Sequence, residues 1–339
     1  MKIVHWNISK TSHPNYALKK YEDELYRNLD DIKGEGFSLK RFRRPENKIL
    51  GNTIFSWLLY KNNDADLVHA TSQTLAPAVY FKNVSKFVVT VHDLTPMVYP
   101  SENDDLSLKI QYLLTPRALK RADKIIADSR FTKDELLRLT KLKKEDIEVV
   151  HLGVDHELYR PMDKLECKKR FGLNPEDKHM LVVSSNLVHK RMDIAKRLFE
   201  NLHAERDEVK LIKAGYGEGL DGDGIINIGW VPEEDMPLLF NASDAYLHTS
   251  EYEGFGLPIL EAMACGVPVI ASNRASIPEI VGDCGILLNL KEFETAEVRD
   301  EIVSRLDGGL DEAAIERSEL FSWRKTTLKT LDVYKSLYD

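Results

Sequence analysis

Short apolar runs of strand length alternate with segments in which apolar residues recur every three or four positions, and this pattern fills the first half of the chain. The strand-like runs are 2–7, 37–42, 66–70, 86–91, 124–128 and 147–151; the helical segments are 16–32, 49–60, 106–121 and one that Ser129 caps, with Thr132 as a second candidate cap. Strands separated by helices form a parallel sheet with both faces covered. The first half is therefore predicted to be a doubly wound α/β domain.

The same alternation restarts after residues 152–161 (LGVDHELYRP), which contain a glycine, a proline and mixed polarity and which we interpret as a linker. Strands are predicted at 180–184, 209–214, 225–228, 244–248 and 285–288, and helices at 192–202, 233–240 and 257–264. A chain of 339 residues also exceeds the usual size of one core. We therefore expect two Rossmann-like domains of the α/β class, spanning 1–155 and 156–321.

Composition indicates the cellular compartment in which such a chain works and the partners that it does not favour. The three cysteines, Cys167, Cys265 and Cys284, form no CxxC pair, and their odd number argues against a disulfide framework. There is no secretion signal and no run of 18 apolar residues, so we expect a cytoplasmic protein. Residues 1–160 hold 26 basic against 22 acidic side chains, while the whole chain has a net charge of −8. This balance gives no support to nucleic-acid binding.

One stretch, EGFGLPILEAMACGVPVIAS from Glu253 to Ser272, combines a glycine turn, a short helix and a buried strand. Gly254 and Gly256 bracket Phe255, so the backbone can turn sharply and lie close to a ligand. A helix then begins at Leu257, and its unpaired N–H groups point back at the turn. The start of this helix is therefore a candidate anion site.

Two carboxylates flank that candidate anion site. Glu253 precedes it, and Glu261 follows eight residues later on the helix. The pair can serve one elongated ligand that carries a phosphate between two hydroxyl-rich ends. The alternative is an ordinary α/β crossover in which Glu261 is a surface charge.

This stretch resembles a known motif. Two glutamates eight residues apart, with GFGLP between them and GVPVIAS after them, are similar to the nucleotide-sugar motif of the family 4 retaining glycosyltransferases of the GT-B fold. The linker's Gly-Val-Asp run, followed by an aromatic residue and a proline, resembles the hinge of that family. The resemblance implies two Rossmann-like domains facing a central cleft, with the acceptor bound by the first and the nucleotide sugar by the second. It also implies that the final helix, 322–338, packs back on the first domain.

Four marked positions follow predicted strands at their carboxyl ends, where open α/β sheets bind ligands. They are His92 with Asp93, Lys190, the turn Gly215-Tyr216-Gly217, and Glu253 to Gly256. The resemblance gives the diphosphate to Lys190 and the backbone of 254–257, the ribose to Glu261, and the donor sugar to Glu253 and His92. The predicted donor-binding residues are thus Lys190, Arg191, Gly215, Gly254, Phe255, Gly256, Leu257 and Glu261, and the predicted catalytic residues are His92 and Glu253. From the residues alone, Lys190 is more simply interpreted as a solvated surface cation. His92 could be a general acid or base, a hydrogen-bond donor to a sugar hydroxyl, or a satisfied core group.

The chain departs from the family at two places. Many members carry an arginine six residues before the phosphate-binding lysine, where this chain has Ser184; Arg191 or nearby hydroxyls are the candidate substitutes. The family's glycine-rich loop after the first strand is here residues 8–15, ISKTSHPN, without glycine. This second departure leaves the acceptor the least predictable part.

The run HDLTP…YP that begins at His92 is most similar to members that transfer mannose from GDP-mannose, with a UDP-sugar as the alternative donor. A basic cluster lies just before the apolar segment 49–60: Lys40, Arg41, Arg43, Arg44 and Lys48. Such a cluster can hold a protein on anionic lipid at the inner face of the cell membrane, which suits a glycan or lipid-linked acceptor. The alternative is a solvated loop before a core-packed helix.

No cofactor or metal is expected besides the nucleotide sugar as co-substrate. Histidines and cysteines lack metal-ligand spacing, and Asp221-Gly222-Asp223 is interpreted as a turn. The predicted function is a retaining, metal-independent hexosyltransferase. Two alternatives stay open: a GT-B epimerase or phosphorylase, and a non-catalytic sugar-nucleotide-binding partner of another transferase. A Rossmann dehydrogenase is disfavoured because no GxGxxG follows the first strand.

Overall fold

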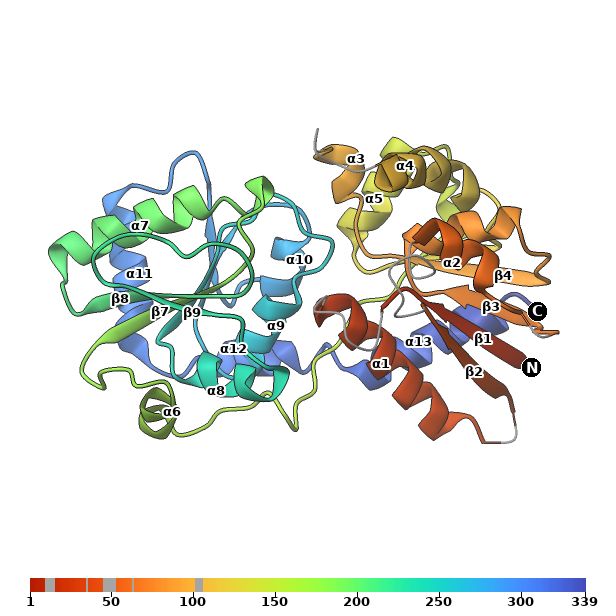
Figure 1. Cartoon of the computed structure of the whole chain (residues 1–339). Helices are drawn as coiled ribbons and strands as arrows, with labels where there is room; N and C mark the ends of the chain where they lie inside the picture. Colours follow the sequence, from red (N-terminus) through yellow and green to blue (C-terminus); the bar gives the residue numbers. More distant parts are fainter. Residues whose placement is uncertain (10–15, 35, 45–52, 63, 101–105) are drawn as a thin grey trace. The chain divides into compact units, whose positions relative to one another are not determined.

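The structure of the protein is a computed structural model that describes the chain except for residues 10–15, 35, 45–52, 63 and 101–105. The chain forms two compact units (Figure 1). The first unit comprises residues 1–153 and 323–339, and the second comprises residues 154–322. The chain therefore enters the second unit after Gly153 and returns to the first after Ser322.

The first unit is built on a six-stranded sheet in which all neighbouring strands are parallel. In spatial order the strands are β2 (Ser38–Arg43), β1 (Lys2–Asn7), β3 (Leu67–Ala70), β4 (Lys86–Val91), β5 (Lys124–Ala127) and β6 (Ile147–Val149). The central strands β3 and β4 are buried almost throughout, as expected when helices cover both faces. The strand order reverses beside β1, and such a switch point is where doubly wound sheets bind ligands. The predicted fold class is confirmed for this unit.

The helices of the first unit are α1 (Tyr16–Ile32), α2 (Thr53–Leu59), α3 (Thr95–Val98), α4 (Leu106–Leu119), α5 (Arg130–Leu139) and α13 (Trp323–Lys335), with the 3-10 segments η1 (Gln73–Tyr80) and η2 (Lys144–Asp146). Ser129 caps α5 by accepting the N–H of Thr132, so Thr132 lies inside the helix. The sequence did not reveal η1, because Pro77 inside it interrupts the helical signal. Of the predicted helix 49–60, residues 49–52 lie outside the described part of the chain.

A buried polar network joins α13 to the sheet of the first unit. The hydroxyl of Tyr334 lies 3.0 Å from Nε2 of His5 on β1 and 2.6 Å from Nδ1 of His69 on β3. The other ring nitrogen of His69 lies 2.8 Å from the hydroxyl of Thr90 on β4. All four side chains are fully buried. Figure 1 shows α13 beside α1, with which it packs. Residues from the far end of the sequence thus complete the core of the first unit.

The second unit is built on another six-stranded parallel sheet. In spatial order its strands are β12 (Ile286–Leu288), β11 (Val269–Ser272), β10 (Ala245–His248), β7 (Lys178–Val183), β8 (Val209–Ala214) and β9 (Ile225–Gly229). Strands β10 and β11 are buried along their whole length. The predicted doubly wound class holds here too.

The helices of the second unit are α6 (Lys164–Arg170), α7 (Met192–Glu205), α8 (Met236–Asn241), α9 (Leu257–Ala264), α10 (Ile277–Val281), α11 (Ala296–Gly308) and α12 (Glu312–Ser318), with η3 (Val188–Lys190) and η4 (Glu233–Asp235). The predicted helix 233–240 is divided into η4 and α8, because Pro237 begins a new helix. Helix α9 matches its prediction at both ends. The sequence did not reveal α11, in which only Ile302 and Leu306 are buried, so its apolar periodicity is weak.

Candidate functional site

Two loops of the second unit, one after β7 and one after β10, are hydrogen-bonded to each other. Their strands are neighbours in the sheet. The hydroxyl of Thr249 lies 3.0 Å from the backbone carbonyls of both Lys190 and Arg191. The N–H of Glu251 donates to the carbonyl of His189 at 2.7 Å. These bonds hold the Lys190 loop against the start of the Glu253 stretch.

Glu253 is the centre of a chain of polar contacts in this corner. The ammonium of Lys190 donates to Oε1 of Glu253 at 2.6 Å, and Nε2 of His248 lies 2.9 Å from the same oxygen. The other ring nitrogen of His248 lies 3.0 Å from the hydroxyl of Tyr246. Burial alone would raise the pKa of Glu253, but the Lys190 ammonium and the His248 bond outweigh it and hold that pKa far below its ordinary value. Glu253 is therefore an ionised carboxylate.

The backbone turn before α9 depends on one glycine. Gly256 has φ of 112°, a left-handed conformation that disfavours a side chain, and α9 begins at the next residue, Leu257. The hydroxyl of Ser276 lies 2.9 Å from the carbonyl of Glu253 and 2.8 Å from that of Phe255, and these two contacts hold the turn in place. The Phe255 ring is buried and packs edge-to-face on Phe321 at 6.0 Å between ring centres. Phe255 therefore has only its backbone to offer a ligand.

Glu261 lies on α9 and is only 1% exposed, which rules out the interpretation as a surface charge. The pKa of the Tyr246 hydroxyl is raised well above its ordinary value, mostly by burial. The negative charges of Glu253 and Glu261 each raise this pKa further. Both glutamates that were predicted to serve one ligand therefore act electrostatically on the same buried tyrosine.

Arg191 occupies a left-handed backbone position, with φ of 48°, between η3 and α7. Its guanidinium donates to Glu251 at 2.5 Å and makes two bonds of 3.0 Å to the carboxylate of Asp193. Two carboxylates of the chain itself therefore compensate the charge of this candidate substitute for the missing arginine.

The turn after β8 is packed directly on the loop after β7. Gly215 has φ of 103°, and a Cβ at this position would lie 2.6 Å from the carbonyl oxygen of Ser184. A Cβ on Gly217 would likewise lie 3.0 Å from the side-chain oxygen of Asn186. Below the turn, the side chain of Lys213 is only 1% exposed, and its ammonium lies 3.0 Å from the carbonyl of Tyr216. Sequence analysis did not single out Lys213, although a lysine inside the apolar strand VKLIKA was a visible signal.

His92, in the first unit, has both ring nitrogens bound to its own chain. Nδ1 lies 2.6 Å from the carboxylate of Asp128, and Nε2 lies 2.8 Å from the backbone carbonyl of Thr71. A carbonyl only accepts, so Nε2 carries a proton. Burial alone would lower the pKa of His92, but the carboxylate of Asp128 outweighs it and raises the pKa to about 9. Near neutral pH His92 is an imidazolium, and Nε2 must leave Thr71 before it can bind a sugar hydroxyl.

Asp93 plays a local part beside His92. Its carboxylate accepts the N–H of Thr95 at 2.8 Å, at the start of α3. Asp128, the partner of His92, was not predicted; the signal for it was an acidic residue at the end of the apolar run KIIAD.

Two family models match the chain, one in each unit. The model described as glycosyl transferases group 1 matches residues 163–289, and the model described as Glycosyltransferase Family 4 matches residues 16–158. Together these matches cover most of the sequence. The chain belongs to the family 4 glycosyltransferases.

Individual relatives of this family 4 glycosyltransferase differ in what their names say they act on. O-antigen chain mannosyltransferase B of Escherichia coli is 29% identical over 275 residues, which cover 75% of this chain and 71% of the relative. The D-inositol 3-phosphate glycosyltransferase of Mycobacterium marinum is 30% identical over 245 residues, which cover 65% of this chain and 51% of the relative. The structure of Anabaena HepE in complex with UDP-glucose aligns with a TM-score of 0.75 at 18% identity, covering 99% of this chain and 100% of that one. This likeness confirms the GT-B fold.

In this family 4 glycosyltransferase a buried carboxylate supports the loop after β1, where the family's glycine-rich loop was missing. Glu22 on α1 is fully buried and accepts the N–H of Ile8 at 2.7 Å, the N–H of Ser9 at 3.2 Å and the hydroxyl of Thr71 at 2.7 Å. The rest of this loop, residues 10–15, lies outside the described part of the chain. Glu22 was not predicted, because nothing in a helix of mixed polarity marks one acid as buried.

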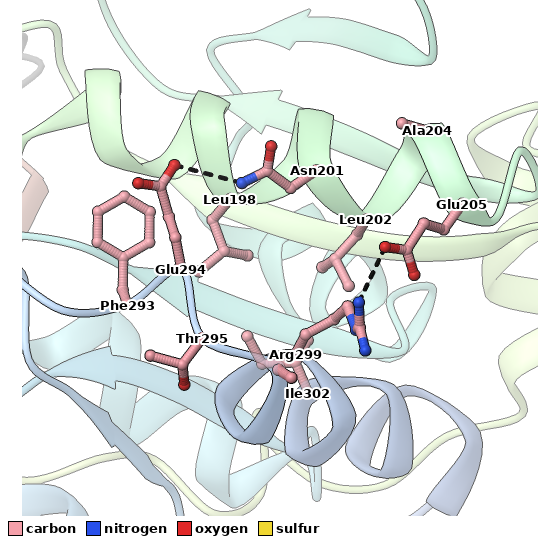
Figure 2. A pocket seen from close by; sticks show the side chains of 11 residues that line it. Leu198, Asn201, Leu202, Ala204, Glu205, Phe293, Glu294, Thr295, Arg299 and Ile302 are labelled. Atoms are coloured by element: carbon pink, nitrogen blue, oxygen red, sulfur yellow. Dashed lines mark hydrogen bonds and ion pairs between the residues drawn. The ribbon is translucent and has the colours of Figure 1, made fainter.

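Two further observations concern metal ligands in the described chain and a cavity in the second unit. Among the described residues no cluster of three or more histidine, cysteine, aspartate or glutamate side chains is arranged to hold a metal ion. A cavity of about 370 Å³ lies between α7 and the segment that leads into α11 (Figure 2). Its polar side chains are bound to one another: Asn201 to Glu294 and Glu205 to Arg299. None of the predicted donor-binding residues lines this cavity.

Proposed function

We propose that this protein transfers a hexose from a nucleotide diphosphate sugar to a glycan or lipid-linked acceptor, with retention of configuration and without a metal ion. The second unit binds the donor and the first binds the acceptor. The observation that carries this proposal is the contact of Lys190 with Glu253, beside the start of α9 and near the buried Glu261. A cation and the start of a helix can bind a phosphate, and the carboxylates beside them can accept hydrogen bonds from hydroxyl groups on either side of it.

Each group has a defined task in this proposal. Glu261 accepts hydrogen bonds from the ribose, and Glu253 accepts them from the donor sugar. Lys190 and the N–H groups at the start of α9 bind the diphosphate, where negative charge grows as the bond to the sugar breaks; groups already in place for that charge are the main source of rate. The leaving phosphate takes the proton of the acceptor hydroxyl, so no dedicated base is needed. His92, as an imidazolium, donates a hydrogen bond and does not act as a base.

GDP-mannose is the donor that we favour, supported by the HDLTP…YP run and by the mannosyltransferase relative from Escherichia coli. UDP-glucose, present in the HepE structure of similar fold, is the alternative. A thermal-shift panel of GDP, UDP and ADP with their sugars tests the choice, because a ligand that binds the folded protein raises its apparent stability. A shift with GDP and GDP-mannose supports our proposal, and a shift confined to the UDP compounds contradicts it.

Release of nucleoside diphosphate measures the reaction itself. Release that requires an acceptor, together with NMR of the product showing the donor's anomeric configuration, is the expected result, and EDTA should leave the rate unchanged. A product that forms without an acceptor points to an epimerase. Binding without any turnover over a broad acceptor panel, with unchanged cellular glycans in the Glu253→Ala and Lys190→Ala variants, points to a non-catalytic partner.

We also propose that the first unit contacts anionic membrane through α2 and the end of η1. Phe55, Leu58 and Leu59 on α2 are 47%, 52% and 43% exposed, and Phe81 after η1 is 50% exposed. The ammonium of Lys82 lies beside them, 2.7 Å from the carbonyl of Leu58. Apolar side chains next to a cation suit the boundary between lipid head groups and acyl chains. Among the described residues no helix is long and apolar enough to cross a membrane.

The basic cluster itself is partly neutralised within the protein. Arg41 and Arg43 on β2 both donate to the carboxylate of Asp23 on α1, at 2.5 Å each, while Lys40 is exposed. Lys48 lies outside the described part of the chain. In liposome flotation we expect Phe55→Ser with Leu58→Ser to reduce binding to anionic vesicles more than Lys40→Ser does. Equal flotation of all variants would rule out contact through α2.

A further inference from the structure

The side chain of Lys213 is buried beneath the turn that follows β8. It is 1% exposed, and its ammonium lies 3.0 Å from the carbonyl oxygen of Tyr216 and 3.4 Å from that of Gly215. Within the described chain it has no carboxylate partner. Taking an ammonium out of water without a counter-ion is costly, and burial accordingly lowers the pKa of Lys213.

The other cations at this edge of the sheet are compensated by acids of the chain. Lys190 pairs with Glu253 at 2.6 Å, and Arg191 pairs with Glu251 and Asp193. Lys213 is therefore the cation at the edge whose charge the described chain leaves uncompensated.

The contacts of Lys213 also orient two peptide groups. In a planar trans peptide the N–H points opposite to the preceding C=O. Because the carbonyls of Gly215 and Tyr216 point at the buried ammonium, the N–H groups of Tyr216 and Gly217 point away from it. Neither amide donates to another group within the described chain, and both residues are exposed. Successive amides in a turn of this kind form a concave site for an anion.

The turn also touches the position where the family arginine is absent. The carbonyl of Ser184 is the atom that a Cβ on Gly215 would meet, and the N–H of Ser184 donates to the carbonyl of Ala214 at 3.0 Å. Lys213 and Ser184 therefore belong to the same corner of the sheet, where β7 and β8 end side by side.

We propose that Lys213 is the second cation of the donor site: it turns the amides of Tyr216 and Gly217 toward a phosphate of a nucleoside diphosphate and supplies the charge that the chain lacks at Ser184. The inference rests on the proposed function, because it requires a diphosphate ligand. Lys213 does not touch that ligand and is a positioning residue. Its effect is confined to ligands that carry the diphosphate, because its charge acts on the anion and not on the nucleoside.

The test compares a nucleoside diphosphate with its nucleoside, by titration calorimetry of the full chain with GDP, guanosine, UDP and uridine. Lys213→Gln keeps a hydrogen-bond donor for the two carbonyls but removes the charge. We expect this variant to bind the preferred nucleoside diphosphate with about tenfold lower affinity than the unsubstituted protein does. Its affinity for the matching nucleoside should fall by less than about twofold. Because Lys213 is buried, added salt should change the size of this loss only slightly. Lys210→Gln, on the more exposed part of the same strand, is the matched control and should leave both affinities unchanged.

The outcomes separate this inference from the proposed function. If the unsubstituted protein binds no nucleoside diphosphate, the proposed function fails. If it binds one and Lys213→Gln binds it equally well, or loses diphosphate and nucleoside in equal measure, the role of Lys213 fails alone. Lys213→Met removes both charge and donor, and should repeat the selective loss. If neither variant folds, Lys213 serves the fold only, and the inference is overturned.

Discussion

The ammonium of Lys190 lies 2.6 Å from the carboxylate of Glu253, so the cation proposed for the diphosphate and the anion proposed for the sugar neutralise each other. Both side chains are largely buried, with 20% and 15% of their surfaces exposed, so water screens the pair only in part. Under the proposed function, Glu253 occupies the position that a phosphate oxygen takes when the donor binds. The donor then breaks this ion pair and releases Glu253 toward its sugar.

Removing the charge of Glu253 should therefore strengthen diphosphate binding while weakening transfer. In Glu253→Gln we expect nucleoside diphosphate affinity to rise about threefold, because Lys190 no longer has a competing anion. The rate of transfer should fall at least about tenfold, because the sugar loses a charged acceptor. Calorimetry and diphosphate release measure the two effects. Glu200→Gln, on α7 and paired with Lys196, is the control; lower diphosphate affinity in Glu253→Gln would contradict the competition.

Removing Lys190 should have a selective cost. Lys190→Ala should weaken nucleoside diphosphate binding by about tenfold or more and nucleoside binding much less, because only the phosphates face the ammonium. Calorimetry with GDP against guanosine, and UDP against uridine, measures the ratio. Lys196→Ala on α7, whose side chain is 35% exposed, is the comparison and should have no effect. An equal loss for diphosphate and nucleoside would assign Lys190 to the fold.

A methyl group at Gly215 should destabilise the second unit. The new Cβ would lie 2.6 Å from the carbonyl of Ser184, and φ of 103° disfavours any side chain, so we expect a loss of about 2 kcal/mol in the free energy of unfolding. Gly308→Ala on α11 is the matched control: its Cβ meets nothing within 4 Å, and φ there is not positive. Thermal denaturation of the two variants checks the difference. Equal melting temperatures would show that the turn relaxes freely.

The first unit should be most stable near pH 6.5. Burial lowers the pKa of His5 to about 3, so the stability that this neutral ring contributes is complete above pH 6.5 and is lost as the pH falls toward 3. Asp128 raises the pKa of His92 to about 9, so that contribution is complete below pH 6.5 and is lost as the pH rises through 9. His92→Gln should therefore flatten the alkaline limb while leaving the acid limb in place.

Tryptophan fluorescence can follow this unit by itself. Trp6, Trp57 and Trp323 are buried in the first unit, whereas Trp230 lies in the second and is 55% exposed. In a Trp230→Phe background, the free energy of unfolding obtained from denaturation curves between pH 4 and pH 10 should pass through a maximum. In the His92→Gln variant this free energy should not decline on the alkaline side of the maximum. An alkaline limb that persists in His92→Gln would show that another group produces it.

Removing one hydroxyl should weaken the attachment of α13. Tyr334→Phe removes the hydroxyl that now forms hydrogen bonds with His5 and His69. Leaving a buried polar group without its hydrogen bond lowers the free energy of unfolding by about 1 to 3 kcal/mol. Fluorescence-monitored denaturation of the first unit measures the loss. Tyr338→Phe, on an exposed tyrosine that bonds a backbone carbonyl, is the control and should cost little.

The sequence predicted those parts of the fold that depend on local patterns. Strands such as β1, β4 and β8 and helix α9 have the predicted bounds because an apolar run, or a glycine before a helix, is a signal carried by adjacent residues. The Glu253 stretch was found for the same reason. Surface helices such as α11 were missed because they bury too few side chains to show a period.

What the sequence could not supply was the pairing of distant side chains. Lys190 and Glu253 were each named, but their contact depends on β7 lying beside β10 in the sheet. His248 and Asp128 were missed because a polar residue at the end of a strand looks the same whether it meets solvent or a buried partner. Lys213 was missed although a lysine inside an apolar strand is visible in the sequence, because its two carbonyl partners belong to the turn that follows. Arg191 was named for its charge, and only the fold places Glu251 and Asp193 on it.

The first unit takes its last helix, α13, from residues 323–335, while the whole of the second unit is one continuous segment. During synthesis at the ribosome the second unit therefore has all of its residues before the first unit does. Until α13 emerges from the ribosome, His5 and His69 lack their contact with the Tyr334 hydroxyl, and the face of α1 that packs on α13 stays uncovered. Of the two units, the first therefore completes its fold later, although most of its residues precede the second unit in the sequence. A nascent chain halted before Tyr334 should expose that face to chaperones.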